Sequence, residues 1–237
     1  MSAIPTNPPS APPARRPVPP LENGDRLTRA EFERRYQAMP GVKKAELIEG
    51  IVYMPSPVRI TQHGQPHVIL CTWMGYYYGR TPGLAGIGDN TTARFDEDNE
   101  PQPDLMLLLP KSVGGFAVIG PDGYVAGPPT LVAEIAASSV SLDLHAKFHT
   151  YRRTGVREYL VWRTDDVAVD WFVLRDGQYV PLPRDAAGII RSEHFPGLWL
   201  DATALLVGDL PGVLRSVDAG VATPEHAEFV RRLTPPS

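Results

Sequence analysis

Two carboxylates stand in stretches that otherwise have the composition of buried strands. Asp104 directly precedes the apolar run 105–109, and Glu134 lies inside the run Leu131–Ala136. A carboxylate among apolar neighbours costs free energy unless a cation meets it. Two such acids on adjacent strands would supply oxygen ligands for one divalent metal ion, which is the chemistry that metal-dependent cleavage of a phosphodiester requires.

The alternation of side chains along a strand determines whether both acids reach the same end of a sheet. Asp104 shares a strand face with Met106, and Glu134 shares one with Val132. If the two strands are neighbours, both carboxylates point to one end. Each acid alone has an ordinary alternative, since Asp104 could open the strand in a turn and Glu134 could pair with a basic residue. Together the two acids favour a metal site.

A lysine follows the second acid by thirteen positions, in a segment with helical character. Lys147 and Tyr151 fall on one helical face, and Asp143 lies four residues before Lys147. That spacing is also typical of an ordinary surface ion pair. A lysine that reached the carboxylates could hold the attacking water or stabilise negative charge that develops on a phosphate.

Other residues could add ligands to this site. Glu46 and Glu49 flank an expected hairpin, and either could provide a third carboxylate, although glutamates on hairpins are often only solvated. His63 and His67 are four residues apart, a spacing that zinc sites use. The pattern His-Glu-x-x-His is absent and no third zinc ligand is obvious, so His63, at the start of its expected helix, is the histidine to test.

The histidines at 145 and 149 repeat the spacing of four, and we expect them to be ordinary surface or core residues. Cys71 lies in an apolar helical stretch, where a buried and inert thiol is expected. The sequence contains neither a P-loop nor a Gly-x-Ser-x-Gly nucleophile motif, which argues against those two chemistries.

Composition indicates an ordinary soluble protein that has one medium-sized domain. Of the 237 residues 43% are hydrophobic and 21% charged, and no stretch is long and apolar enough to predict a membrane span. Cys71 is the single cysteine, which excludes an internal disulfide and favours a reducing, cytoplasmic location. Because the net charge is −4, a nucleic-acid substrate would need a local basic patch or a bound metal ion to attract it.

The order of elements predicts three regions: a flexible proline-rich tail over 1–25, a folded domain over 26–208 and a helical extension over 209–237. Thr28 and Glu31 have capping-box spacing for a first helix, and a hairpin should turn at Gly50. Further expected elements are a helix over 61–78, strands in 84–95, a loop over 110–129, a helix capped within 138–141 that ends near 155, strands at 158–162, 167–174 and 178–182, and a helix that Thr223-Pro224 opens.

This series of motifs resembles the Uma2 family, which is similar to the PD-(D/E)XK nucleases. The resemblance spans about residues 28 to 205. Its motifs are Glu46-Leu47-Ile48-Glu49-Gly50, His63, Pro103-Asp104, Glu134-Ile135-Ala136-Ala137-Ser138-Ser139, Asp143-x-x-x-Lys147-x-x-x-Tyr151 and Gly155-Val156-Arg157-Glu158-Tyr159. It implies an α/β, restriction-endonuclease-like fold with a mixed central sheet flanked by helices and an antiparallel meander in the C-terminal half.

The resemblance also implies roles for individual residues. Asp104 and Glu134 would bind Mg²⁺ or Mn²⁺, and Glu46 would be an additional acid of the site. The usual nuclease motif has a lysine two residues after the second acid, where this chain has Ala136. The family implies that Lys147, from the following helix, takes its place.

We therefore expect a metal-dependent endonuclease that hydrolyses phosphodiester bonds of DNA. Dimerisation is compatible with this expectation, because many nucleases of this fold cut two strands as pairs. A catalytically silent nuclease-fold module for binding or assembly is the alternative, motivated by the acidic net charge and the displaced lysine. A metal hydrolase with a substrate other than DNA is a third option.

Overall fold

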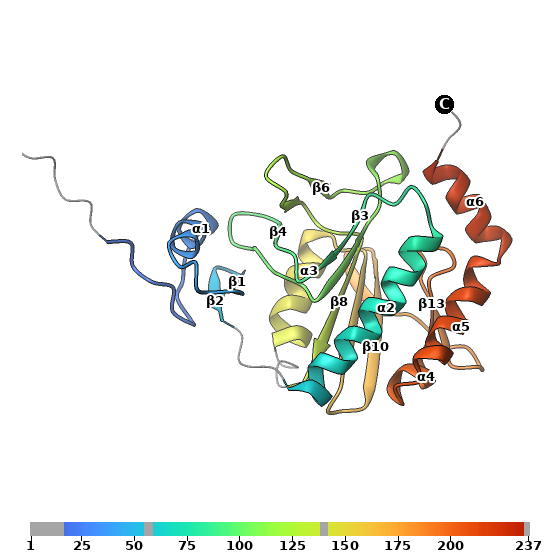
Figure 1. The fold of residues 1–237 in the computed structure, drawn as a ribbon. Helices are drawn as coiled ribbons and strands as arrows, with labels where there is room; N and C mark the ends of the chain where they lie inside the picture. The colour runs from blue at the N-terminus through green and yellow to red at the C-terminus, as the bar shows by residue number, and fades with distance from the viewer. Residues whose placement is uncertain (1–16, 55–58, 138–141, 235–237) are drawn as a thin grey trace, which may run out of the picture.

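A mixed β-sheet with helices on both faces forms the centre of the molecule (Figure 1). The computed structural model describes residues 17–54, 59–137 and 142–234. The sheet has the strand order β11–β10–β9–β8–β5–β3. Only β8 and β9 run parallel within it, and the other neighbours are antiparallel. Its strands are β3 (Gly86–Asp89), β5 (Leu105–Leu108), β8 (Leu131–Ala136), β9 (Glu158–Arg163), β10 (Ala168–Arg175) and β11 (Gln178–Pro181). This architecture confirms the expected fold class.

The C-terminal half of this sheet is the antiparallel meander that the sequence predicts. β9 pairs with β10, and β10 pairs with β11. Asp176 and Gly177 connect β10 to β11 with φ angles of 48° and 73°. Two successive positive φ angles match the right-handed twist of the flanking strands, which is why Asp-Gly marks such turns in sequences.

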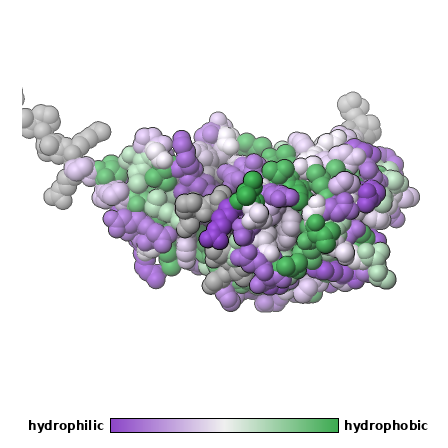
Figure 2. Space-filling view, turned by 60° about the horizontal axis from the view of Figure 1, so that its bottom comes forward, coloured by the Kyte–Doolittle hydropathy of each residue, from purple (hydrophilic) through white to green (hydrophobic). Residues whose placement is uncertain are grey.

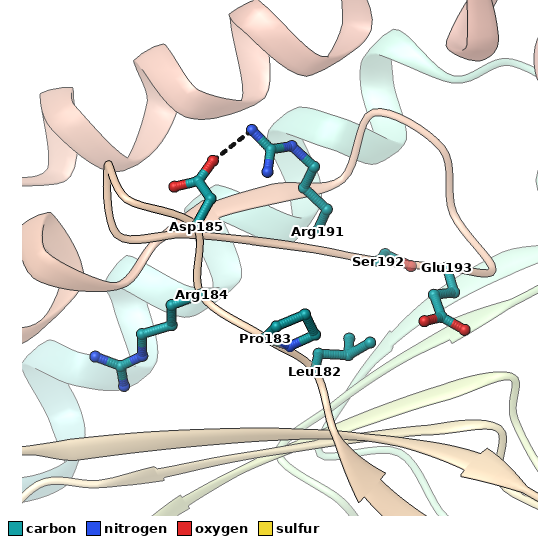
Figure 3. A pocket seen from close by; sticks show the side chains of 7 residues that line it. All are labelled: Leu182, Pro183, Arg184, Asp185, Arg191, Ser192 and Glu193. Carbon is teal, nitrogen blue, oxygen red and sulfur yellow. Dashed lines mark ion pairs between the residues drawn. The ribbon is translucent and has the colours of Figure 1, made fainter.

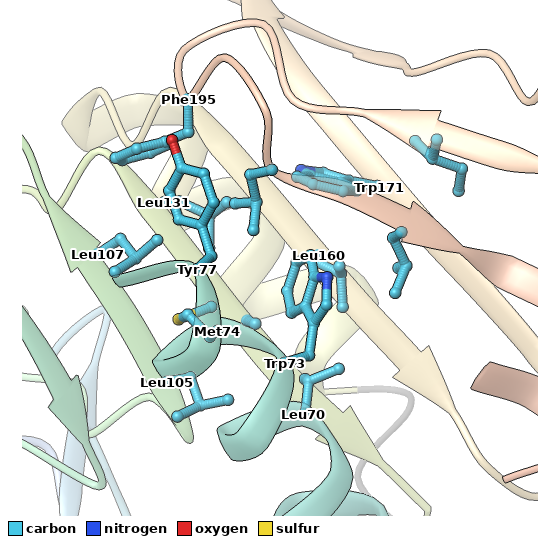
Figure 4. Close-up of a cluster of buried hydrophobic side chains, with 14 of the residues drawn as sticks. Leu70, Trp73, Met74, Tyr77, Leu105, Leu107, Leu131, Leu160, Trp171 and Phe195 are labelled. Carbon is cyan, nitrogen blue, oxygen red and sulfur yellow. The ribbon is translucent and has the colours of Figure 1, made fainter. Parts of the chain in front are cut away.

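The helix α2 (Gln65–Arg80) covers one face of the sheet and builds the main core (Figure 4). It follows a π-helical turn, η1 (Ile60–Gly64), within the helical region expected at 61–78. Leu70, Trp73, Met74 and Tyr77 recur at helical spacing and are fully buried. The ring of Trp73 meets that of Trp171 edge-on at 5.7 Å, which is a favourable aromatic geometry.

The helix α3 (Phe148–Thr154) lies on the opposite face, in the connection between the parallel strands β8 and β9. It continues a π-helical turn, η3 (Leu142–Lys147), and ends at Gly155, whose φ of 93° suits a glycine. Tyr151 packs edge-on against Tyr159 at 4.9 Å. The expected N-cap serines within 138–141 lie outside the described residues.

An N-terminal unit with its own small core precedes the sheet. It contains α1 (Arg29–Gln37), β1 (Glu46–Ile48) and β2 (Ile51–Tyr53). Thr28 caps α1 and accepts a hydrogen bond from the backbone N of Glu31, as the sequence predicts. Leu21 is buried in this core, so packed structure begins before residue 26, the expected start of the folded domain. The proposed domain boundaries stay a prediction.

Backbone hydrogen bonds dock the N-terminal unit on the acidic turn at 96–100. The N–H of Gly50 donates to the carbonyl of Asp98 at 2.8 Å, and Leu47 exchanges two hydrogen bonds with Glu100. Arg29 adds a bond from its N–H to the carbonyl of Glu97 at 2.7 Å. These contacts fix the hairpin beside the main sheet and so determine where Glu46 points.

A second small sheet joins residues 93–94, in a region where the sequence predicts strands, to two strands within 110–129, for which the sequence predicts only a loop. Its order is β4–β7–β6. Each of its strands is two residues long, too short for an alternating pattern to be recognised. The elements of this part are β4 (Ala93–Arg94), the 3₁₀ turn η2 (Lys111–Val113), β6 (Val118–Ile119) and β7 (Val125–Ala126).

The last part of the chain packs on the same core as α2. Thr223 caps the final helix and Pro224 is its first residue, as the sequence predicts. Val217 and Phe229 reach the main core cluster. The elements here are β12 (Ile189–Arg191), β13 (Trp199–Asp201), α4 (Ala202–Leu206), α5 (Leu210–Val221) and α6 (Pro224–Leu233).

The surface mixes residue types. Figure 2 shows apolar residues interspersed among hydrophilic ones on the face that it views. Two of the most exposed apolar side chains, Ile60 and Val207, belong to separate elements, and such isolated residues are normal on protein surfaces. No helix among the described residues is long and apolar enough to cross a membrane.

We predict that Leu70→Ala lowers the free energy of unfolding by about 2–5 kcal/mol, because it leaves a cavity between α2 and the sheet. Val68 lies two residues earlier on the same helix and is 62% exposed. Val68→Ala should therefore change the stability by less than about 0.5 kcal/mol. Urea denaturation of both variants measures the difference, and equal losses would contradict the packing described here.

Candidate active site

Asp104 and Glu134 lie opposite each other where β5 begins. The last ladder pair of β5 and β8 is Leu105 with Ala133, so the two acids are one position further along. Both carboxylates are almost fully buried, at 3% and 2% exposure. The backbone N–H of Asp104 donates to Oε2 of Glu134 at 3.3 Å. The two acid-bearing strands are therefore neighbours, as the sequence analysis required.

Two side chains of the helical segment formed by η3 and α3 donate hydrogen bonds to Glu134. Nζ of Lys147 donates to Oε1 of Glu134 at 3.0 Å, and the hydroxyl of Tyr151 donates to the same oxygen at 2.8 Å. Lys147 ends the π-helical turn η3, and Tyr151 follows four residues later in α3. The lysine of this helical segment thus reaches the second acid, although the strand position two residues after Glu134 is Ala136.

Lys147 stands among three carboxylates. Besides Glu134, its Nζ lies 3.1 Å from Oε1 of Glu46 and 3.6 Å from Oδ1 of Asp143. The backbone N–H of Gln102 also donates to Oε1 of Glu46, at 2.7 Å. Lys147 and Asp143 are both buried, so their contact is not an ordinary surface ion pair. We call Glu46, Asp104, Glu134 and Asp143 the carboxylate cluster.

The charges around Lys147 do not balance if every group is ionised, because three acids face one ammonium. Burial, together with smaller contributions from the other acids of the cluster, outweighs the opposing charge of Lys147 and raises the pKa of Glu134 to about 8. Burial alone would lower the pKa of Lys147, but the surrounding carboxylates outweigh this effect and hold it above its usual value. Lys147 therefore stays charged, while Glu134 retains a proton more readily than a solvated acid.

Asp104 has a different environment, at the border between the core and solvent. Its Oδ2 accepts a hydrogen bond from the N–H of Ile135 at 2.9 Å and lies 3.3 Å from Nε2 of His63. Nζ of Lys44 lies 3.5 Å from Oδ1. Burial raises the pKa of Asp104, but the bond from His63 and the charge of Lys44 prevail and hold it well below its usual value. Asp104 is therefore ionised.

The donor chemistry of the cluster fits a hard divalent cation, since its ligand atoms are carboxylate oxygens and the acids near Lys147 carry excess negative charge. The oxygen atoms of these acids are less close together than the ligand atoms of a formed metal site. Among the described residues, Asp104, Glu134 and Glu46 do not bring three oxygens within 4.8 Å of one another. Asp104 instead shares such a set with His63 and His67. The ammonium of Lys147 contacts both Glu46 and Glu134 in this arrangement.

A separate hollow of about 300 Å³ lies among the loops before and after β12 (Figure 3). An ion pair between Asp185 and Arg191, at 2.6 Å, closes one side of it. None of its lining residues belongs to the carboxylate cluster. Its lining therefore adds nothing to the chemistry of that cluster.

Comparison with known proteins places this arrangement in a family. The model of the family Uma2, described as "Putative restriction endonuclease", matches residues 29–203. The chain belongs to the Uma2 family. A nuclease-like function follows from that description at the level of the family. A comparison with curated proteins finds no match.

Uma2 membership agrees with a similarity among solved structures. The chain resembles the crystal structure of a protein from Anabaena variabilis ATCC 29413 whose title reads "a putative nuclease belonging to DUF820". The TM-score is 0.54 at 12% sequence identity, and the alignment covers 74% of this chain and 97% of the other. At this identity the likeness shows a shared fold.

Within the Uma2 domain, the sequence did not reveal several contacts. Lys44 and Gln102 lie in loops, where no periodic pattern indicates which way a side chain points. The contact of Lys44 with Asp104 and that of the Gln102 N–H with Glu46 depend on tertiary packing. Asp143 and Tyr151 share the helical face of Lys147, and this spacing was the signal for them. His63 does lie beside an acid, namely Asp104.

We predict that Glu134 makes the stability of the protein fall as pH rises. Its pKa is raised from 4.5 to about 8 in the folded state, so between these values the folded chain binds one more proton than the unfolded chain. The stabilising effect of that proton is complete below pH 4.5 and is lost as pH rises through 8. Wild type should lose up to about 1.4 kcal/mol per pH unit more than Glu134→Gln over this range.

Urea denaturation at intervals from pH 5 to pH 9 tests this difference. The variant Glu225→Gln changes an exposed glutamate of α6 and should follow the wild-type profile. Parallel profiles of wild type and Glu134→Gln would show that Glu134 has an ordinary pKa.

Proposed function

We propose that this protein is a divalent-metal-dependent endonuclease that hydrolyses phosphodiester bonds of DNA. The observation that carries the proposal is the contact of one buried ammonium, Lys147, with Glu134 and Glu46, beside Asp104 at the start of a central strand. Membership in a family described as restriction endonucleases supports it. Asp104, Glu134, Lys147 and Glu46 are the proposed catalytic residues.

Mg²⁺ or Mn²⁺ would be held by Asp104 and Glu134, with Glu46 as a further acid, and would supply Lewis-acid polarisation of the scissile phosphate and a water of lowered pKa. Hydrogen bonds within the protein already hold both carboxylates in place. The N–H of Ile135 and the hydroxyl of Tyr151 each fix one of the two carboxylates. Fixed ligands lose little conformational entropy when they bind an ion.

Lys147 would orient the attacking water or neutralise charge on the phosphoryl oxygens. Its ammonium stays protonated because the carboxylates raise its pKa. Its side chain is only 4% exposed, so bulk water does not screen its charge. A preorganised charge in such a site stabilises a developing anion much more than a solvated lysine could.

Two further side chains lie beside Asp104 on its more exposed side. Lys44 and His63 contact opposite oxygens of Asp104, and both are 22% exposed, more than any member of the carboxylate cluster. A phosphate that approached Asp104 would meet these groups first. The charge of Lys44 offers a local attraction for DNA that the net charge of −4 does not.

A catalytically silent module for binding or assembly is the second candidate. The observation in its favour is that the ammonium of Lys147 pairs with Glu46 and Glu134, two of the acids that would hold a metal ion. A buried, satisfied ion-pair network of this kind can serve structure alone.

We predict that wild type nicks supercoiled plasmid in the presence of Mn²⁺ and that Asp104→Asn and Glu134→Gln lower the rate by roughly 100-fold or more. Both replacements keep side-chain size, and circular dichroism verifies the fold. Glu225→Gln, on the exposed face of α6, is the matched control and should retain wild-type activity. Equal residual nicking by all four proteins would indicate contamination and would refute the endonuclease proposal.

Lys147→Met separates the two candidates. If the protein is a nuclease, this variant should nick plasmid roughly 100-fold more slowly while it binds Mn²⁺ at least as tightly, because a competing ammonium has been removed. Calorimetry and plasmid nicking measure the two effects, with the exposed Lys111→Met as control. If wild type itself neither binds Mn²⁺ at millimolar concentration nor nicks plasmid, the silent module is favoured.

A further inference from the structure

A second group of metal-ligating side chains lies beside the carboxylate cluster but contains none of its members. His67 and Cys71 are one turn apart on α2, and Asp89 ends the edge strand β3. One ligand atom from each of these residues lies within 4.8 Å of the others. The sequence shows only the helical pair, because Asp89 is brought to it by the packing of α2 against β3.

His67 and Asp89 already contact each other. Nε2 of the ring lies 2.8 Å from Oδ1 of Asp89, so an ion bound by both residues would take the place of this contact. Nδ1 of the same ring is buried and has no hydrogen-bond partner among the described residues, so no second contact fixes the tautomer of the ring.

We propose that His67, Cys71 and Asp89 form a binding site for a zinc ion, distinct from the proposed Mg²⁺ or Mn²⁺ site. Nitrogen, sulfur and oxygen donors together suit the borderline-soft Zn²⁺, whereas Mg²⁺ avoids thiolate. Bonds of about 2.0 Å to nitrogen and oxygen and about 2.3 Å to sulfur would require small movements of the ligand atoms, and Nε2 of His67 and Oδ1 of Asp89 would move slightly apart from their present 2.8 Å. Asp89 is 61% exposed, which leaves a path for the ion and a position for water.

A competing set of three ligands shares His67 with this site and consists of His63, His67 and Asp104. The set with Cys71 is favoured for two reasons. Both oxygens of Asp104 have partners outside the competing set, in the N–H of Ile135 and Nζ of Lys44, whereas Asp89 has such a partner at Oδ1, in the amide of Asn90. His67 and Cys71 also belong to the regular helix α2, whereas His63 belongs to the π-helical turn before it.

Titration of the full-length apo protein with Co²⁺, followed by displacement with Zn²⁺, tests the proposal. Wild type should develop the near-ultraviolet charge-transfer band that a cobalt-bound thiolate produces. Cys71→Ser should abolish this band, and Cys71→Ser and Asp89→Asn should each weaken Zn²⁺ binding at least tenfold. His63→Gln should leave both the band and the Zn²⁺ affinity within about twofold of wild type, as should the control Asp98→Asn, an exposed acid outside both sets.

Two results of this titration would overturn the proposal. One is the lack of a thiolate band in wild type. The other is loss of Zn²⁺ affinity in His63→Gln but not in Cys71→Ser, which would assign the ion to the competing set.

Because Cys71 is the single cysteine, alkylation gives a third readout without any substitution. Zn²⁺ should slow the reaction of wild-type Cys71 with iodoacetamide at least tenfold, and an unchanged rate would also refute the site. None of these three results depends on nuclease activity.

Discussion

The structure depends on the burial of several carboxylates around one ammonium. A charge removed from water is tolerated only where partners surround it. Each element near the Lys147 ammonium and its carboxylates therefore has to supply a group of opposite charge or a hydrogen-bond donor. β8 supplies Glu134, the hairpin supplies Glu46 and the turn η3 supplies Asp143 together with the lysine. The hairpin, from a distant part of the sequence, thus shares one electrostatic requirement with β8 and η3, which are consecutive along the chain.

Two stacked histidines, His63 in η1 and His67 in α2, connect the carboxylate cluster with the proposed zinc site. The rings of His63 and His67 stack with centroids 5.5 Å apart and planes inclined by 20°. His63 contacts Asp104, while His67 contacts Asp89. Of the π-helical turns of the described chain, η3 carries Asp143 and Lys147, and η1 carries His63, which contacts Asp104. Widened turns of this kind are frequent at functional sites.

Local signals in the sequence predicted much of the fold. The capping box at Thr28, the positive-φ turn at Gly50 and the Asp-Gly turn at 176–177 each act through nearest neighbours, so their effects can be seen without the rest of the chain. The two-residue strands β6 and β7 and the helix α4 were not foreseen, because they depend on the surfaces against which they pack. The same limit applies to the site. The pairing of Asp104 with Glu134 could be inferred from strand patterns, whereas Lys44 and Asp89 reach their partners only through tertiary packing.

The N-terminal unit has a core of its own, yet it contributes Glu46 to a cluster that otherwise belongs to the sheet and η3. A cation that joined Glu46 to Glu134 would therefore connect two separately packed parts of the chain. The free energy of binding such a cation would also stabilise the docked arrangement, in the same way that a ligand shifts any equilibrium toward the state that binds it. Under the proposed function, metal binding and the docking of the N-terminal unit on the sheet would thus be thermodynamically linked.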